Sequence, residues 1–142
     1  MVDLRLENER ARERIRSGAS DRLDYAALAY TIHNIYCLME NCFLRIAKTF
    51  ENHLDADAWH RDLVRRMSIP IEAIRPALLD DETAGAVDEL RAFRHVFRNV
   101  YQNPLKPKKV LELDDTVADT VQAFTADCET FIATLRAMIA DY

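Results

Sequence analysis

The sequence predicts an all-α protein, an antiparallel up-and-down bundle of four to five helices. Its 142 residues are 49% hydrophobic, which is enough for one ordinary core. With two glycines and four prolines, it has too few turn residues for an all-β fold. Two long segments carry apolar residues at alternating spacings of three and four, which is the period of a helix.

The first two helices are predicted from their apolar stripes and their end signals. Residues 4–17 carry charges of both signs and a thin apolar stripe, and Gly18 takes the position of a helix C-cap. Ser20 or Asp21 can cap a long helix that reaches about His53. The apolar seam of this long helix consists of Leu28, Ile32, Ile35, Met39, Cys42, Ile46 and Phe50.

Three further helices follow. Asp55 can cap a helix over residues 56–67, with Trp59, Leu63 and Met67 in one stripe. The acidic run 80–82 favours a helix start by its charge, and that helix should span about 83–102, ending before the Asn103-Pro104 pair. Pro107 can open the last helix. Its seam consists of Val117, Val121, Phe124, Cys128, Phe131, Leu135 and Met138.

These elements are expected to form a single domain over residues 1–142, with an N-terminal helix in 1–18 and the bundle core in 20–142. No apolar run approaches the ~18 residues of a membrane span, and the chain start does not read as a signal peptide. We therefore expect a cytoplasmic protein without a membrane partner. The three cysteines form neither a disulfide framework nor a zinc motif and are interpreted as small core residues.

The net charge of −5 hides a segregation of charge along the chain. Residues 90–111 contain no acid but hold six of the nineteen basic residues, so the remainder carries a charge of −11. Two interpretations are open. One is a solvated helix face followed by a lysine-bearing loop, and the other is a phosphate-binding surface.

The residues of the predicted fourth helix divide into two arcs at about 100° per residue. Leu90, Phe93, Phe97 and Val100 share the apolar arc, and Tyr101 lies one heptad from Arg94 at its border. Three guanidiniums within two turns repel one another unless an anion, carboxylates or a partner subunit neutralises them. The polar arc consists of Arg91, Arg94, His95, Arg98, Asn99 and Gln102.

The polar arc has the groups that metal-free RNA cleavage requires. Arginine donates bidentate hydrogen bonds to phosphate, and histidine exchanges a proton near neutral pH. The chain has no glycine-rich phosphate loop, nucleophile signature or metal-ligand spacing, so no metal or cofactor is expected. The remaining histidines, His33, His53 and His60, are interpreted as structural or surface groups.

The stretch from Arg94 to Tyr101 resembles the R-x4-H-x-Y signature of the HepT-like branch of HEPN domains. These are small helical bundles found as toxins beside minimal nucleotidyltransferase antitoxins. The likeness covers the chain from about Asp24 to the C-terminus. It also rests on residues 29–47, 59–63, 74–76 and 89–95.

The resemblance implies a metal-independent endoribonuclease that forms a homodimer, with the RNA cleft at the dimer interface. Arg94 would be the family arginine, and Tyr101 the tyrosine that the partner nucleotidyltransferase modifies with AMP. Arg91 and Arg98 are candidate phosphate ligands. Glu40 and Asn41 are candidates to line the cleft from the long helix, although a buried or interface hydrogen bond explains them equally well.

The chain departs from the signature at Asn99, where the family has histidine. Asparagine cannot act as a general acid or base, a function that contributes about 10²- to 10⁴-fold to a rate. Three accounts are open: a weakened or inactive member that keeps the fold and dimer, replacement of the proton carrier by His95, or an inactivated form of a toxic protein. A non-catalytic module that binds RNA or the nucleotidyltransferase, and a purely structural dimer, are the alternative functions.

Overall fold

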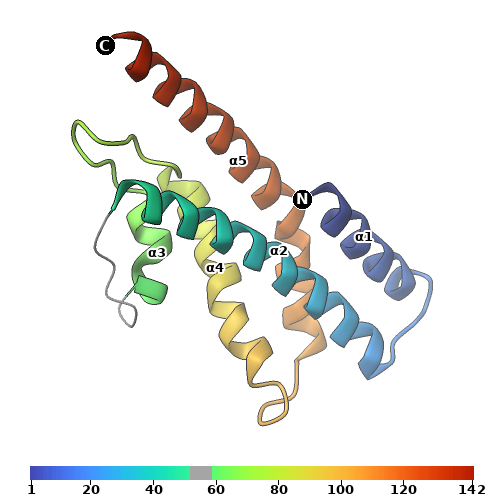
Figure 1. Ribbon diagram of the computed structural model, residues 1–142. Coiled ribbons are helices and arrows are strands. Elements are labelled where there is room, and N and C mark those ends of the chain that lie inside the picture. Colours follow the sequence, from blue (N-terminus) through green and yellow to red (C-terminus); the bar gives the residue numbers. More distant parts are fainter. Residues whose placement is uncertain (52–58) are drawn as a thin grey trace. The chain divides into compact units, whose positions relative to one another are not determined.

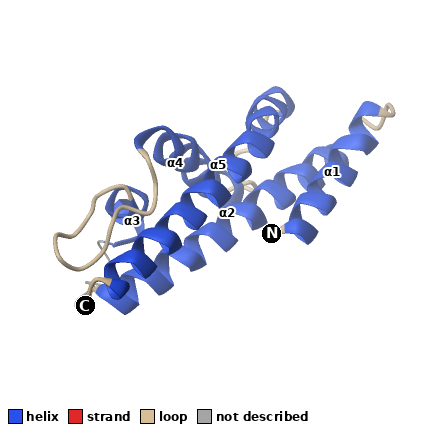
Figure 2. Cartoon of the chain, turned by 90° about the horizontal axis from the view of Figure 1, so that it is seen from above, coloured by secondary structure: helices blue, strands red, loops and turns tan. Residues whose placement is uncertain are grey.

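The computed structural model describes residues 1–51 and 59–142, the first three of the second range by their backbone alone. The predicted all-α class and helical bundle are confirmed, since the only β-type pairing in this part of the chain is an isolated bridge between Ile71 and Arg75. The described helices are α1 Val2–Arg16, α2 Arg22–Phe50, α3 Trp59–Met67, α4 Asp81–Arg98 and α5 Pro107–Ala140 (Figures 1 and 2). None of them combines the length and apolarity needed to cross a membrane.

The chain contains two compact units. The first comprises residues 1–39 and 89–118, and the second comprises residues 40–88 and 119–142. Helices α2, α4 and α5 are each divided between the two units, with one part in each. Helix α1 belongs to the first unit and α3 to the second. The single domain over 1–142 stays a prediction.

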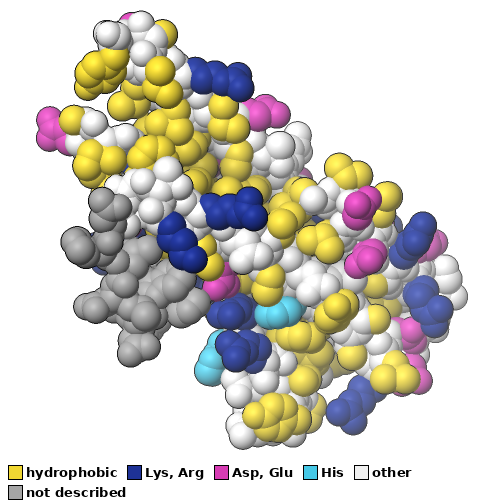
Figure 3. Space-filling view, in the orientation of Figure 1, with side chains coloured by type: hydrophobic (Ala, Val, Ile, Leu, Met, Phe, Trp, Pro, Cys, Tyr) yellow, Lys and Arg dark blue, Asp and Glu magenta, His cyan; other side chains and the backbone are white. Residues whose placement is uncertain are grey.

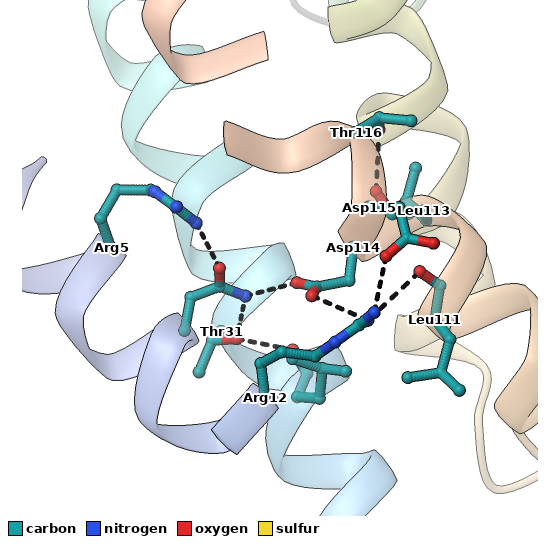
Figure 4. A network of polar contacts seen from close by, with 10 residues as sticks. Arg5, Arg12, Thr31, Leu111, Leu113, Asp114, Asp115 and Thr116 are labelled. Atoms are coloured by element: carbon teal, nitrogen blue, oxygen red, sulfur yellow. Dashed lines mark hydrogen bonds and ion pairs between the residues drawn. The ribbon is translucent and has the colours of Figure 1, made fainter. Parts of the chain in front are cut away.

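In the first unit, α1 lies antiparallel to α2 and to α5. Asn8 bonds Thr31 of α2 while Arg14, further along α1, pairs with Asp24 nearer the start of α2. Asn8 also bonds Asp114 of α5, and Arg12 reaches back to the carbonyl of Leu111 (Figure 4). The fully buried apolar residues of this unit include Leu28, Ala29, Ile32 and Ile35 of α2, Leu90 of α4 and Val117 of α5.

The predicted signals between α1 and α2 are confirmed. Gly18 follows the C-cap residue Ser17 and has a φ of 103°, a left-handed conformation that glycine adopts without strain. Asp21 Oδ1 accepts a hydrogen bond from the amide of Leu23 at 3.2 Å, so Asp21 is the N-cap of α2. The turn between the two helices therefore follows directly from local sequence.

In the second unit, α2 and α5 run parallel. The rings of Phe43 and Phe124 meet edge to face with centroids 5.9 Å apart, and those of Phe50 and Phe131 do so at 6.4 Å. The predicted α2 seam is confirmed in this unit at Phe50, which contacts Phe131 of α5, but its members are not the most buried residues here. The fully buried residues are Phe43 and Ala47, because Phe43 contacts α5, whereas Cys42, Ile46 and Phe50 are only half-buried.

Buried Arg75 organises the connection between α3 and α4. Its side chain is 1% exposed and donates to Glu51 Oε1 at 3.0 Å. It also donates to the carbonyls of Ile69, Pro76 and Arg66, each at 3.1 Å. One guanidinium therefore joins the end of α2, the end of α3 and the loop.

The predicted stripe of α3 is confirmed at Leu63 and Met67, both fully buried. The predicted cap Asp55, the helix start at residue 56 and the long-helix end at His53 lie outside the described residues.

The acidic start of α4 is confirmed, although the helix begins at Asp81 and not at about Thr83, and its predicted end is wrong. Asp80 Oδ1 accepts a hydrogen bond from the amide of Thr83 at 2.7 Å, which makes Asp80 the N-cap. The helix ends at Arg98 rather than Gln102. Beyond it, the amide of Asn99 bonds the carbonyl of Val96 at 3.2 Å, a three-residue bond of a tightened last turn.

Candidate nucleic-acid interface

The last two turns of α4 carry a cationic face, formed by Arg91, Arg94, His95 and Arg98 and called here the α4 face. Arg91 and Arg94 are half-buried, and His95 and Arg98 are exposed. No acidic residue occurs between positions 90 and 111. Figure 3 shows basic and histidine side chains gathered around the C-terminal half of α4.

An aromatic contact fixes the rotation of α4 within the first unit. Phe97 stacks on His33 of α2 with centroids 4.8 Å apart and planes at 26°, and its ring also lies 6.5 Å from that of Tyr30. On the same side of α4, Phe93 is half-buried and Leu90 is 1% exposed. The aromatic side of α4 therefore packs on α2, and the α4 face occupies the other arc of the helix.

His33 contributes more to this arrangement than the sequence indicates. The sequence predicts only a structural or surface histidine, and the structure places its half-buried ring in the contact that orients α4. Its Nε2 lies 3.4 Å from Sγ of Cys37, one turn further along α2. In the sequence, the only indication that His33 could contact α4 is its position one turn after Tyr30, and this spacing is compatible with many helix packings.

Arg94 is one of the two half-buried arginines of the α4 face. Its Nε is buried, which restricts the guanidinium more than at exposed Arg98. His95 and Arg98 lie in the last turn of α4, where a positive side chain interacts favourably with the helix dipole. That interaction contributes about 0.3–1 kcal/mol per group. It does not account for the positive charges of Arg91 and Arg94, because these residues lie further from the helix end.

Asn99 is the first residue after α4 and caps its end. Its Nδ2 donates to the carbonyl of His95 at 2.8 Å, which satisfies one of the carbonyls that a helix end leaves unpaired. Since the helix has ended, the predicted helical positions of Asn99, Val100 and Gln102 are wrong. Tyr101 was predicted to lie on the helix at the border of the apolar arc, and this position is wrong for the same reason.

Tyr101 lies in the turn after α4 with 78% of its surface exposed. The candidate residues that one unit brings together are Arg91, Arg94, His95, Arg98, Asn99 and Tyr101. Glu40 and Asn41 fall in the second unit. Glu40 is 6% exposed, and Asn41 is exposed.

The fold and this site define a class: small helical bundles in which one helix ends in a cationic, acid-free segment. Within that class, the chain belongs to the HepT-like family, because the model of the HepT-like protein family matches residues 27–135. Helix α1 precedes the matched region. No curated protein and no solved structure matches the chain significantly.

Proposed function

We propose that the protein is a HepT-like toxin of a toxin–antitoxin system and that it binds RNA through the α4 face. The observation that carries this proposal is the acid-free cationic segment on α4, in a chain whose remainder is strongly acidic. A generally basic surface would bind any polyanion. A local one directs the phosphate backbone to one helix.

The residues of the α4 face suit the cleavage of RNA without a metal ion. In such a reaction the 2′-hydroxyl of the RNA loses its proton and attacks the adjacent phosphorus, the bond from phosphorus to the 5′-oxygen breaks, and the 5′-oxygen takes up a proton. Guanidiniums stabilise the charge that accumulates on the phosphate oxygens. Arg94 is proposed for this task because its Nε is buried, which restrains its guanidinium more than that of exposed Arg98. Arg91 and Arg98 would bind flanking phosphates, and exposed His95 is the one histidine of the face that could exchange a proton.

Two copies of the chain are proposed to form the cleft, with Arg94 and position 99 of each at the dimer interface. This part of the proposal rests on family membership. A minimal nucleotidyltransferase is the proposed antitoxin. Tyr101 suits its modification with AMP, because its side chain is exposed in the turn that follows the α4 face, and an added nucleotide would bring negative charge to that end of the helix.

Asn99 favours a second candidate, a non-catalytic module that binds RNA or the nucleotidyltransferase. An amide does not exchange protons near neutral pH, and the Nδ2 of Asn99 already donates to the helix end. In this form of the proposal, the chain keeps the phosphate-binding face of its family and lacks the proton carrier at position 99.

The test compares variants of the full chain on a structured RNA in the presence of EDTA. Arg98→Ala should weaken RNA binding and lower the salt dependence of log K by about 0.7 for each phosphate that the variant no longer neutralises. Arg136→Ala is the matched control, since Arg136 is an exposed arginine of α5 in the other unit. Equal binding by wild type, Arg98→Ala and Arg136→Ala would refute RNA binding by the α4 face.

Cleavage is tested on the same RNA with wild type, Asn99→His and Asn99→His combined with Arg94→Ala. Metal-free cleavage gained by Asn99→His and abolished in the double variant supports the ribonuclease fold and the role of Arg94. Binding without cleavage in all three forms supports the non-catalytic module. Growth arrest of the host by Asn99→His, relieved by a co-expressed minimal nucleotidyltransferase, would support the toxin–antitoxin assignment.

A further inference from the structure

The C-terminal part of α5 carries more apolar surface than its own unit buries. Phe124 and Phe131 pack on α2 and are 7% and 6% exposed. Ile132 lies about 100° around the helix from Phe131 and is 48% exposed, and Ile139, one heptad further along, is 73% exposed. Figure 3 shows hydrophobic side chains gathered over this part of the helix. The contact with α2 therefore covers one side of the apolar arc of α5 and leaves the other side open.

The open side is a narrow apolar stripe with a heptad period. It consists of Cys128, Ile132, Leu135 and Ile139, at spacings of four, three and four, and is called here the α5 stripe. The two isoleucines are exposed, and Cys128 and Leu135 are half-buried. Alternating spacings of three and four are the pattern by which two helices pair along a seam. The α5 stripe thus has the pattern of a surface that packs on a further helix, in addition to the contact with α2.

Two exposed charges of opposite sign flank the α5 stripe. Glu129 and Arg136 lie one heptad apart, and each directly follows a residue of the stripe. From such flanking positions, the helices of a pair form ion pairs with each other. Two copies of the stripe can run antiparallel with Ile132 of each copy against Leu135 of the other. Glu129 of each copy then comes beside Arg136 of the other, so the stripe complements a second copy of itself in both apolar pattern and charge.

We propose that the α5 stripes of two copies of the chain pair antiparallel and join the copies through their second units. This contact is separate from the α4 face, which belongs to the first unit, and does not depend on RNA binding. A lipid surface fits the stripe less well, because a helix that lies on a membrane carries several basic residues, and Arg136 is the only basic residue after Lys109. Four side chains bury far less than the roughly 800 Å² per partner of a stable interface, so the association depends on protein concentration.

The first test follows self-association of the full chain by sedimentation velocity over a range of protein concentrations. Ile139→Asp should lose a concentration-dependent step that wild type shows, and Ile74→Asp is the matched control, since Ile74 is 47% exposed in the same unit. Arg136→Glu should lose the same step, because it places two acids side by side, and Glu129→Arg combined with Arg136→Glu should restore it. All three replaced residues of α5 and its flank are exposed, so the fold should be kept. Equal association by wild type and Ile139→Asp, or no recovery in the double reversal, would refute the proposal.

A cross-link tests the antiparallel register. The proposed pairing places Ile139 of one copy against Cys128 of the other, whereas within one chain these positions lie three turns apart, about 16 Å along the helix. Ile139→Cys combined with Cys37→Ser and Cys42→Ser leaves two thiols, which a disulfide can join only between copies. Mild oxidation should give a covalent dimer linked through positions 128 and 139, and dithiothreitol should separate it. A link between the two positions 139 would indicate a parallel pair and overturn the proposal, as would the absence of a covalent dimer.

Discussion

Replacement of Asn8 by alanine should detach α1 from the first unit. Asn8 is 2% exposed, and its Nδ2 donates to the Asp114 carboxylate at 2.7 Å and to the Thr31 hydroxyl at 3.1 Å. A hydrogen bond to a charged group contributes about 1.5–3 kcal/mol, and a neutral one about 1 kcal/mol. Asp114 keeps its ion pair with Arg12 at 3.1 Å, which limits the loss. We expect the free energy of unfolding to fall by about 2–4 kcal/mol.

The assay is urea unfolding followed by far-ultraviolet circular dichroism, with amide hydrogen exchange of α1 to detect opening of that helix alone. Glu9→Ala is the matched control on the same helix. It removes an exposed ion pair with Arg5 at 3.3 Å, which should change the stability by about 0.5 kcal/mol or less. If Asn8→Ala and Glu9→Ala have equal effects in both measurements, the buried network does not hold α1.

Three further predictions concern other sites. Arg75→Met should lower the free energy of unfolding by about 3 kcal/mol in urea titration, because it removes the hydrogen bonds that the guanidinium donates to Glu51 and to three carbonyls, although Glu51 keeps its ion pair with Arg66. Asp80→Ala should lower the melting temperature at neutral pH. Hydrogen bonds from Thr83 lower the pKa of Asp80, so its stabilising effect is present above pH ~4 and is lost as the pH falls through the lowered value, where variant and wild type should converge. Alkylation of Cys42, followed by mass spectrometry, should accelerate about tenfold between about pH 6 and pH 8, following a thiolate whose pKa is about 7.

The helix starts could be predicted from sequence because their signals are local. Asp21 and Asp80 each accept a bond from an amide two or three residues away, and Pro107 opens α5. The end of α4 could not be predicted, because two stop signals compete there. The Asn103-Pro104 pair indicates the later one, whereas the side chain of Asn99 bonds the carbonyl of His95 and marks the earlier one.

Contacts between distant residues are beyond local sequence reasoning. Asn8 is an ordinary polar residue of a charged helix until it is paired with Asp114, 106 residues away. In the sequence, Arg75 is noticed only as part of a family likeness. In the structure it bonds Glu51 and is the largest fully buried side chain in the described part of the molecule. In both cases a polar residue is buried because other elements supply its hydrogen bonds, and the sequence does not indicate which elements these are.

The position of Asn99 makes the histidine substitution a test of chemistry more than of folding. The residue follows the last turn of α4, is only half-buried, and its side chain donates to the carbonyl of His95. A neutral imidazole with its proton on Nδ1 also offers a donor, and complete loss of the bond would cost about 1 kcal/mol. That is small beside the 10²- to 10⁴-fold, about 3–5 kcal/mol in activation free energy, that a proton carrier contributes. A folded Asn99→His protein that binds RNA without cutting it would therefore place the missing function elsewhere than at position 99.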